Sequence, residues 1–206
     1  MTVIHYDPSL TMREARAEYF AANHFGADGG YNDPWVDFKI GPVPLPFPNS
    51  ASRVRALRFH DMHHILTGYD TTFIGELEIG AWELAAGCHN EPFAWFINLS
   101  AMGAFLASPR RIFRAFVRGL RSQSLYGQDA ESLLSMQVRD VRTKLSVPSS
   151  EVTSVKISEL AQFCIAVGVG FVVGLAALAV FLPLSPIGIV VLNLRRRAAS
   201  KDALAT

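Results

Sequence analysis

The spacing of apolar and polar positions along the chain predicts an all-α domain. Apolar residues recur at intervals of three and four, and capping residues or glycines separate the segments. Thr11 and Glu14 form a capping-box pattern, and Gly68 is a typical helix stop. The helices expected from this pattern cover residues 11–22, 53–67, 72–86, 91–107, 110–121 and 129–144.

Two stretches of this domain carry further information. Residues 41–49 hold a proline at every second position, which excludes a helix interior and favours an extended chain. This stretch is either a rigid connector or the wall of an apolar pocket. The helix expected over 91–107 is apolar on most sides, so we expect it in the core or beside a lipid tail.

The C-terminal part of the chain predicts a membrane segment. Residues 160–194 form a run of 35 uncharged positions, and its first part, 160–182, is mostly apolar. Roughly 20 such residues span a bilayer as a helix. Pro183 and Pro186 predict a break, so the segment is either transmembrane or re-entrant, and we favour a re-entrant hairpin. The fold class is therefore a helical, bundle-like domain with a C-terminal hydrophobic transmembrane or re-entrant segment.

The charge distribution divides the chain in the same way. Residues 1–100 carry 6 Lys/Arg and 12 Asp/Glu, whereas residues 101–206 carry 13 and 6. A basic C-terminal half suggests an anionic lipid partner, and the arginine-rich helix over 110–121 is either a membrane-surface helix or an ordinary amphipathic one. The expected parts are a metal- and lipid-binding domain (1–147), a linker (148–158), a membrane segment (159–194) and a basic tail (195–206).

Candidate chemistry is concentrated near the middle of the domain. His60 and His64 lie four positions apart, on one face of the expected helix. Asp61 adjoins the first histidine, and Glu76 lies twelve positions after the second, where an antiparallel helix could return it to the pair. Two nitrogens with one or two carboxylates suit a divalent metal such as zinc. The predicted metal ligands are His60, Asp61, His64 and Glu76.

Neighbouring residues have weaker candidate roles. Glu83 shares a helix face with Glu76, so it either orients a ligating histidine or is a surface charge. His63 lies off the metal face and is expected to pack or to form hydrogen bonds. Arg58 is either solvated or binds an anionic substrate group. The two cysteines show no ligand spacing, which predicts reduced thiols.

The motif resembles that of a known family. His60-Asp61-x-x-His64, eleven residues and then Glu76 is similar to the signature of the ubiquinone-biosynthesis family founded by the fourth protein of the coenzyme Q series, here the Coq-four family. Leu-Thr-Gly-Tyr after His64 and Trp-Glu-Leu at 82–84 fit as well. The similarity covers roughly residues 10–145, whereas the last fifty residues differ from the usual member.

The resemblance implies an all-α protein that binds a metal and an isoprenoid lipid. It implies oxidative decarboxylation at ring carbon one of a polyprenyl-hydroxybenzoate precursor, with Asp61 as a catalytic residue and zinc as the preferred ion. The implied partners are that precursor, the membrane and other quinone-biosynthesis proteins, and a homodimer is compatible. The implied location is membrane-associated, with the catalytic domain in the cytoplasm or, in a mitochondrion, on the matrix side.

Two other functions remain open at this stage. One is a non-catalytic lipid-binding scaffold whose metal is structural, which would lack the open coordination position of a catalytic site. The other is a zinc peptidase, since His-Asp-x-x-His is one methylene from His-Glu-x-x-His, although the third-ligand spacing argues against it. No phosphate-binding loop, dinucleotide fingerprint or nucleic-acid module is recognisable in the sequence.

Overall fold

The structure, a computed structural model, describes residues 5–36, 39–40, 43–44, 46–148 and 154–204. Helices dominate it, as the sequence predicts, and the strands form two short antiparallel pairs, β1 with β4 and β2 with β3. In chain order the elements are α1 (Met12–Asn23), β1 (Trp35–Val36), β2 (Lys39–Ile40), β3 (Val43–Pro44), β4 (Phe47–Pro48), α2 (Ala51–Thr67), α3 (Phe73–Ala86), α4 (Pro92–Met102), the 3₁₀ turn η1 (Phe105–Ala107), α5 (Pro109–Leu120), α6 (Ala130–Leu134), α7 (Val138–Lys144) and α8 (Ile157–Leu204).

Local capping explains where the early helices begin. Thr11 and Glu14 form the predicted capping box of α1, in which each satisfies a backbone amide of the other. Ser50 caps α2, and Gly68 ends it in the left-handed conformation, which glycine adopts without strain. The proline-rich stretch before α2 contributes β3 and β4, so its described part is extended, as expected.

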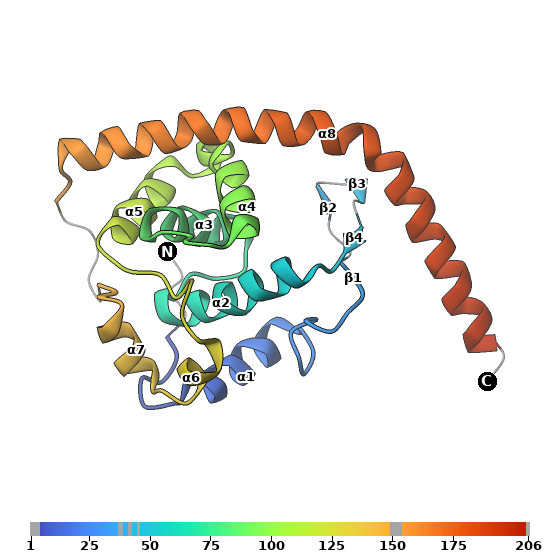
Figure 1. Ribbon diagram of the computed structural model, residues 1–206, viewed down its shortest axis with the longest axis horizontal. Coiled ribbons are helices and arrows are strands. Elements are labelled where there is room, and N and C mark those ends of the chain that lie inside the picture. Colours follow the sequence, from blue (N-terminus) through green and yellow to red (C-terminus); the bar gives the residue numbers. More distant parts are fainter. Residues whose placement is uncertain (1–4, 37–38, 41–42, 45, 149–153, 205–206) are drawn as a thin grey trace.

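A stack of α3, α4 and α5 forms the centre of the domain. Gly119 of α5 lies so close to α3 that a Cβ atom there would overlap the carbonyl oxygen of Trp82 and lie 2.9 Å from the Cβ atom of Ala85. Trp82 itself is fully buried. One hydrophobic core lies around this stack, and a second joins α1, α2, α6 and α7, so α2 and α3 meet between the two cores (Figure 1).

Two expected helices are interrupted. The expected helix over 91–107 ends at Met102, and residues 105–107 form η1, because Gly103 is a weak helix former that packs directly against α8. The expected helix over 129–144 divides into α6 and α7. Between them, Gln137 bridges Thr11, and the Met12 amide donates to the Met136 carbonyl at 2.8 Å, so pairing with the N-terminal segment replaces helical hydrogen bonds there.

The predicted hairpin at Pro183–Pro186 is wrong, because α8 continues through both prolines to Leu204. Each proline removes one helical donor, which bends a helix without necessarily ending it, and Figure 1 shows α8 changing direction in this part. Within the described residues, α8 is the one helix long and apolar enough to cross a membrane, over Ile157–Arg195. Residues 149–153 of the predicted linker over 148–158 lie outside the described residues, and its last two residues already belong to α8.

Candidate metal centre

The candidate metal centre lies where α2 meets α3. His60 and His64 are one turn apart on α2, and Glu76 lies in the first turn of α3. The side chain of Thr72 accepts a hydrogen bond from the Gly75 amide and so fixes the start of α3. This cap sets Glu76 opposite the histidine pair, as the antiparallel arrangement predicts.

Three ligand atoms converge at this point. The Nε2 atoms of His60 and His64 are 3.1 Å apart. The carboxylate of Glu76 lies 3.2 Å from Nε2 of His60 and 3.4 Å from Nε2 of His64. Among the described residues, these three form the one group whose ligand atoms all lie within 4.8 Å of one another, so three of the four predicted ligands are brought together.

The other ring nitrogens show why this group needs a cation. Nδ1 of His60 faces Oε1 of Glu83 at 3.0 Å, and Nδ1 of His64 faces the carbonyl oxygen of Tyr69 at 2.9 Å. Both acceptors require a proton on Nδ1, which leaves each neutral ring with a lone pair on Nε2. Two lone pairs and a carboxylate then point at one another, and only a proton or a metal ion between them makes that arrangement favourable.

The spacing fits a metal ion. Zinc bonds of about 2.0–2.1 Å at a tetrahedral angle place two ligand atoms about 3.3 Å apart. The two Nε2 atoms are 3.1 Å apart, Oε2 of Glu76 lies 3.2 Å from His60 and Oε1 lies 3.4 Å from His64, and these separations lie around this value. His60 and Glu76 keep side-chain exposures of 21% and 43%, so the group is reachable from outside. Two histidines and one glutamate leave a fourth position open, which is typical of catalytic rather than structural zinc sites.

Asp61 is not part of this three-residue group. Its side chain is buried, and Oδ2 accepts a hydrogen bond of 2.6 Å from the hydroxyl of Tyr31. Burial raises the pKa of Asp61, against the influence of the charges on His60 and His64. Asp61 therefore lies beside the site and is held there by a tyrosine from the loop before β1.

Without a metal ion, the neighbouring carboxylates favour a proton on the His60 ring. Burial lowers the pKa of His60, but the charges and hydrogen bonds of Glu83 and Glu76 outweigh it and hold this pKa well above the usual value. Burial raises the pKa of Glu76, yet its hydrogen bonds to His60 and His64 keep it far below the usual range. A metal ion that binds here must displace this proton.

Glu83 is a buried carboxylate that connects the metal group with the core. Its Oε1 atom also faces Nδ1 of His63 at 2.7 Å, and its Oε2 atom accepts from Nδ2 of Asn98 at 2.8 Å. Nε2 of His63 accepts from the Leu125 amide at 2.8 Å. His63 is thus the hydrogen-bonding residue that the sequence predicts, and Glu83 takes the orienting position rather than the surface one.

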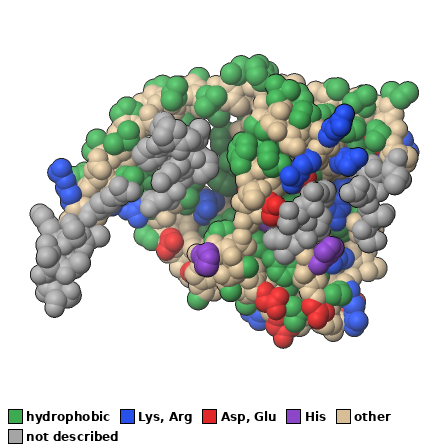
Figure 2. Space-filling model, turned by 180° about the vertical axis from the view of Figure 1, so that it is seen from behind, with side chains coloured by type: hydrophobic (Ala, Val, Ile, Leu, Met, Phe, Trp, Pro, Cys, Tyr) green, Lys and Arg blue, Asp and Glu red, His purple; other side chains and the backbone are tan. Residues whose placement is uncertain are grey.

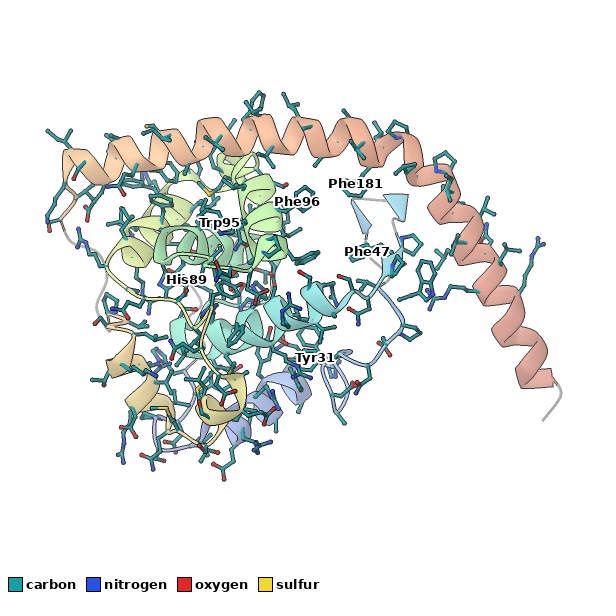
Figure 3. The ribbon with its side chains drawn as sticks, viewed as in Figure 1. Tyr31, Phe47, His89, Trp95, Phe96 and Phe181 are labelled. Atoms are coloured by element: carbon teal, nitrogen blue, oxygen red, sulfur yellow. The ribbon has the colours of Figure 1, made fainter. Side chains whose placement is uncertain are left out.

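Three contributors were not singled out by sequence reasoning. Tyr31 comes from a glycine-rich loop, Tyr19 of α1 stacks on the ring of His64 with centroids 5.5 Å apart, and Asn98 comes from α4. No local pattern marks them, because each reaches the site through tertiary packing. Arg58 lies over the ring of Tyr31, and its guanidinium carbon is 5.5 Å from the ring centroid. Figure 3 shows Tyr31 beneath α2.

The basic helix α5 contacts the protein itself. Arg111 forms two hydrogen bonds with Glu78, Arg121 pairs with Glu159, and Arg118 donates to backbone carbonyls. Ile112, Phe116 and other apolar residues of α5 are buried. These contacts favour the ordinary amphipathic helix over a membrane-surface helix.

Fold and site together define a helical protein with a candidate His₂Glu metal centre and one helix long enough to cross a membrane. Comparison of the chain with protein-family models, curated proteins and solved structures finds no match. The similarity to the Coq-four family accordingly rests on the motif and its neighbouring residues.

Proposed function

We propose that this protein is a metal-dependent enzyme of ubiquinone biosynthesis that acts at a membrane. Its reaction is the oxidative decarboxylation at ring carbon one of a polyprenyl-hydroxybenzoate precursor. The observation that carries the proposal is the convergence of the ligand atoms of His60, His64 and Glu76. The resemblance of the surrounding motif supplies the substrate class.

The net reaction limits what the chain must provide. Replacing a ring carboxylate by a hydroxyl takes up the oxygen of one water molecule and releases carbon dioxide, one proton and two electrons, so a two-electron oxidant such as dioxygen must come from outside the chain. A bound divalent ion supplies a Lewis acid for the negative charge that develops as the carbon–carbon bond breaks. Zinc is the ion we favour, because two imidazoles and a carboxylate suit it.

The residues of the chain have distinct parts in this proposal. His60, His64 and Glu76 hold the ion, and Glu83 orients His60. Asp61, kept beside the site by Tyr31, is placed to accept or return a proton. Burial of the surrounding side chains lowers the local polarity, which strengthens the interaction of the ion with substrate charge.

The first experiment combines metal analysis with lipid extracts. Purified protein should contain about one metal ion per chain, and His64→Ala should lose it. Cells that lack the gene, or carry only His64→Ala, should accumulate a ring-carboxylated precursor. His89→Asn is the matched control, because His89 is exposed and outside the metal group, and asparagine tolerates its positive φ of 42°.

Each result has a definite meaning. Metal retained by His64→Ala would refute the site. Metal lost from His64→Ala without any change in precursors would refute the reaction and favour the lipid-binding scaffold. Digestion of casein that depends on His64 would favour the peptidase instead.

A further inference from the structure

The outer surface of α8 exposes a long series of apolar side chains. Ile165, Phe171, Val172, Leu175 and Leu182 are each between 52% and 66% exposed. Figure 2 shows hydrophobic side chains along the edge of the molecule where α8 runs. A soluble domain rarely exposes so long an apolar surface, and a run of 35 uncharged residues followed by three arginines suits a lipid bilayer.

The opposite side of α8 is packed tightly on the domain. Phe163 is 7% exposed, and its ring lies 5.0 Å from that of Phe113 and 5.4 Å from that of Phe116 between centroids. A Cβ atom on Gly170 would lie 2.5 Å from the Cβ atom of Met102. The two helices therefore touch through their backbones, as small residues allow in membrane helix pairs.

The contact continues along α4 in the antiparallel direction. A Cβ atom on Gly174 would lie 3.3 Å from the carbonyl oxygen of Ser100, and the ring centroids of Phe181 and Phe96 are 6.2 Å apart. Figure 3 shows Phe96 and Phe181 beside the space between α4 and the bent part of α8. The middle of the uncharged run is thus covered on one side by α4.

An upright α8 would carry the domain into the bilayer. Because α4 lies against the middle of the uncharged run, it would enter the hydrocarbon at the same depth. Asn98 joins α4 to the buried carboxylate of Glu83 on α3, so α3 and its charged groups would follow. Charged side chains in the hydrocarbon are costly, and the carboxylate side chain of Glu76 on α3 is 43% exposed. Two arrangements avoid this cost: α8 leaves the domain and spans, or it stays docked and lies in the membrane plane.

We infer that the part of α8 before Pro183 stays docked on α4 and lies in the plane of the membrane, with its outer face in the lipid. The part after Pro186 turns towards the side on which the domain lies (Figure 1). This inference rests on the proposed membrane association and adds how the domain is oriented. Phe96 of α4, 39% exposed, lies beside Phe181 of α8 and adds to the same apolar surface. Both ends of α8 then lie on one side of the bilayer. A single spanning helix would instead separate the domain from the basic C-terminus, which is expected to stay on the cytoplasmic side.

The first test measures the topology of the full chain in sealed membrane vesicles. Cys164 is replaced by Ala, while buried Cys88 is kept as background. A membrane-impermeant maleimide should label Ser154→Cys and Ser200→Cys from the same side of the vesicle. It should not label Val172→Cys until detergent is added, because that position faces the lipid. Labelling of the two ends from opposite sides would show a spanning helix and overturn the inference.

The second test asks whether α8 is docked on α4 in the membrane. Phe96→Cys with Phe181→Cys should be joined by a short bismaleimide, because the two rings lie 6.2 Å apart between centroids and both are about 40% exposed, so neither replacement removes a buried side chain. Phe96→Cys with Val172→Cys is the matched control, since Val172 is 66% exposed on the outer surface of α8. A missing cross-link in the first pair would overturn docking, even where both ends label on one side.

These outcomes are separate from those of the proposed function. Fractionation comes first: a full chain that stays out of the membrane fraction would refute both membrane association and this inference. His64→Ala removes a metal ligand but no contact of α8, so its labelling and cross-linking should equal those of the parent. Topology can thus be overturned while the metal and precursor results stand, and the reverse also holds.

Discussion

The orienting role of Glu83 gives the sharpest test of the metal centre. We expect Glu83→Gln to weaken zinc binding while the fold is retained. In the structure the fully buried carboxylate accepts hydrogen bonds from Nδ1 of His60, from Nδ1 of His63 and from the side-chain amide of Asn98. Burial raises its pKa, but the charges and hydrogen bonds of His60 and His63 hold that pKa well below the usual range, so the group acts as an anion.

The size of the effect follows from the hydrogen bonds that remain. A glutamine oxygen in the place of Oε1 still accepts from both histidines, but the charge is lost, and charge-assisted hydrogen bonds are about twice as strong as neutral ones. The loss at His60 is therefore about 1.4 kcal/mol, which corresponds to about tenfold in zinc affinity. The new amide group also meets the amide of Asn98, donor to donor, unless that side chain turns over.

The assay is competition for zinc against a chromophoric chelator at fixed pH. Glu78→Gln is the matched control: Glu78 is an equally buried carboxylate on the same helix, but it pairs with Arg111 through contacts of 2.6 and 3.0 Å. It should lose thermal stability and keep its zinc affinity. A zinc affinity within twofold of the parent for Glu83→Gln would refute the reasoning, because His60 would then bind the ion without help from Glu83.

Three further predictions follow from other contacts. Tyr31→Phe removes the hydroxyl that holds Asp61, so Asp61 should become an additional ligand of the ion. With Co²⁺ in the site, the higher coordination number should weaken the visible absorption, and an unchanged spectrum would show that Tyr31 does not keep Asp61 away from the ion. Burial lowers the pKa of His60, but the charges and hydrogen bonds of Glu83 and Glu76 raise it well above its usual value, so zinc binding should release a proton from this ring. Calorimetry in buffers of different ionisation enthalpy measures the release, and its absence would contradict a shared proton. Gly119→Ala should lower the free energy of unfolding by about 1–3 kcal/mol and lower Tm by several degrees. Gly168→Ala should not, because the space around Gly168 is open. Equal effects of the two substitutions would show that the contact of α5 with α3 is not tight.

The sequence predicts well those features that depend on residues close together in the chain. The bounds of α2 and α3 agree with expectation to within two residues, because Gly68 and Gly87 act locally to end the helices. The convergence of His60, His64 and Glu76 follows from helical spacing and one reversal of direction. Glu83 is found in the same way, since it is two turns beyond Glu76 on the same face.

Features that depend on distant residues escape this reasoning. The motif assigns Asp61 to the metal, but the structure engages it with Tyr31, thirty positions earlier in the chain. Likewise, the prolines of α8 predict a break, yet the helix continues, because the apolar residues on both sides still favour a helix. In each case a single residue type permits two outcomes, and packing elsewhere decides between them.

The two uses of histidine on α2 connect stability with metal binding. His63 is fully buried, with its pKa lowered by that burial, and it shares one carboxylate oxygen with His60. A cation at the site therefore acts on the same group that holds the core around Trp82 and Tyr126, whose rings lie 5.0 Å from that of His63. A ligand that binds only the folded state stabilises it by about 2.7 kcal/mol at 100 times its Kd. Because His63 and Asn98 bond the same carboxylate that faces His60, packing of the core sets the position of the group that orients this ring.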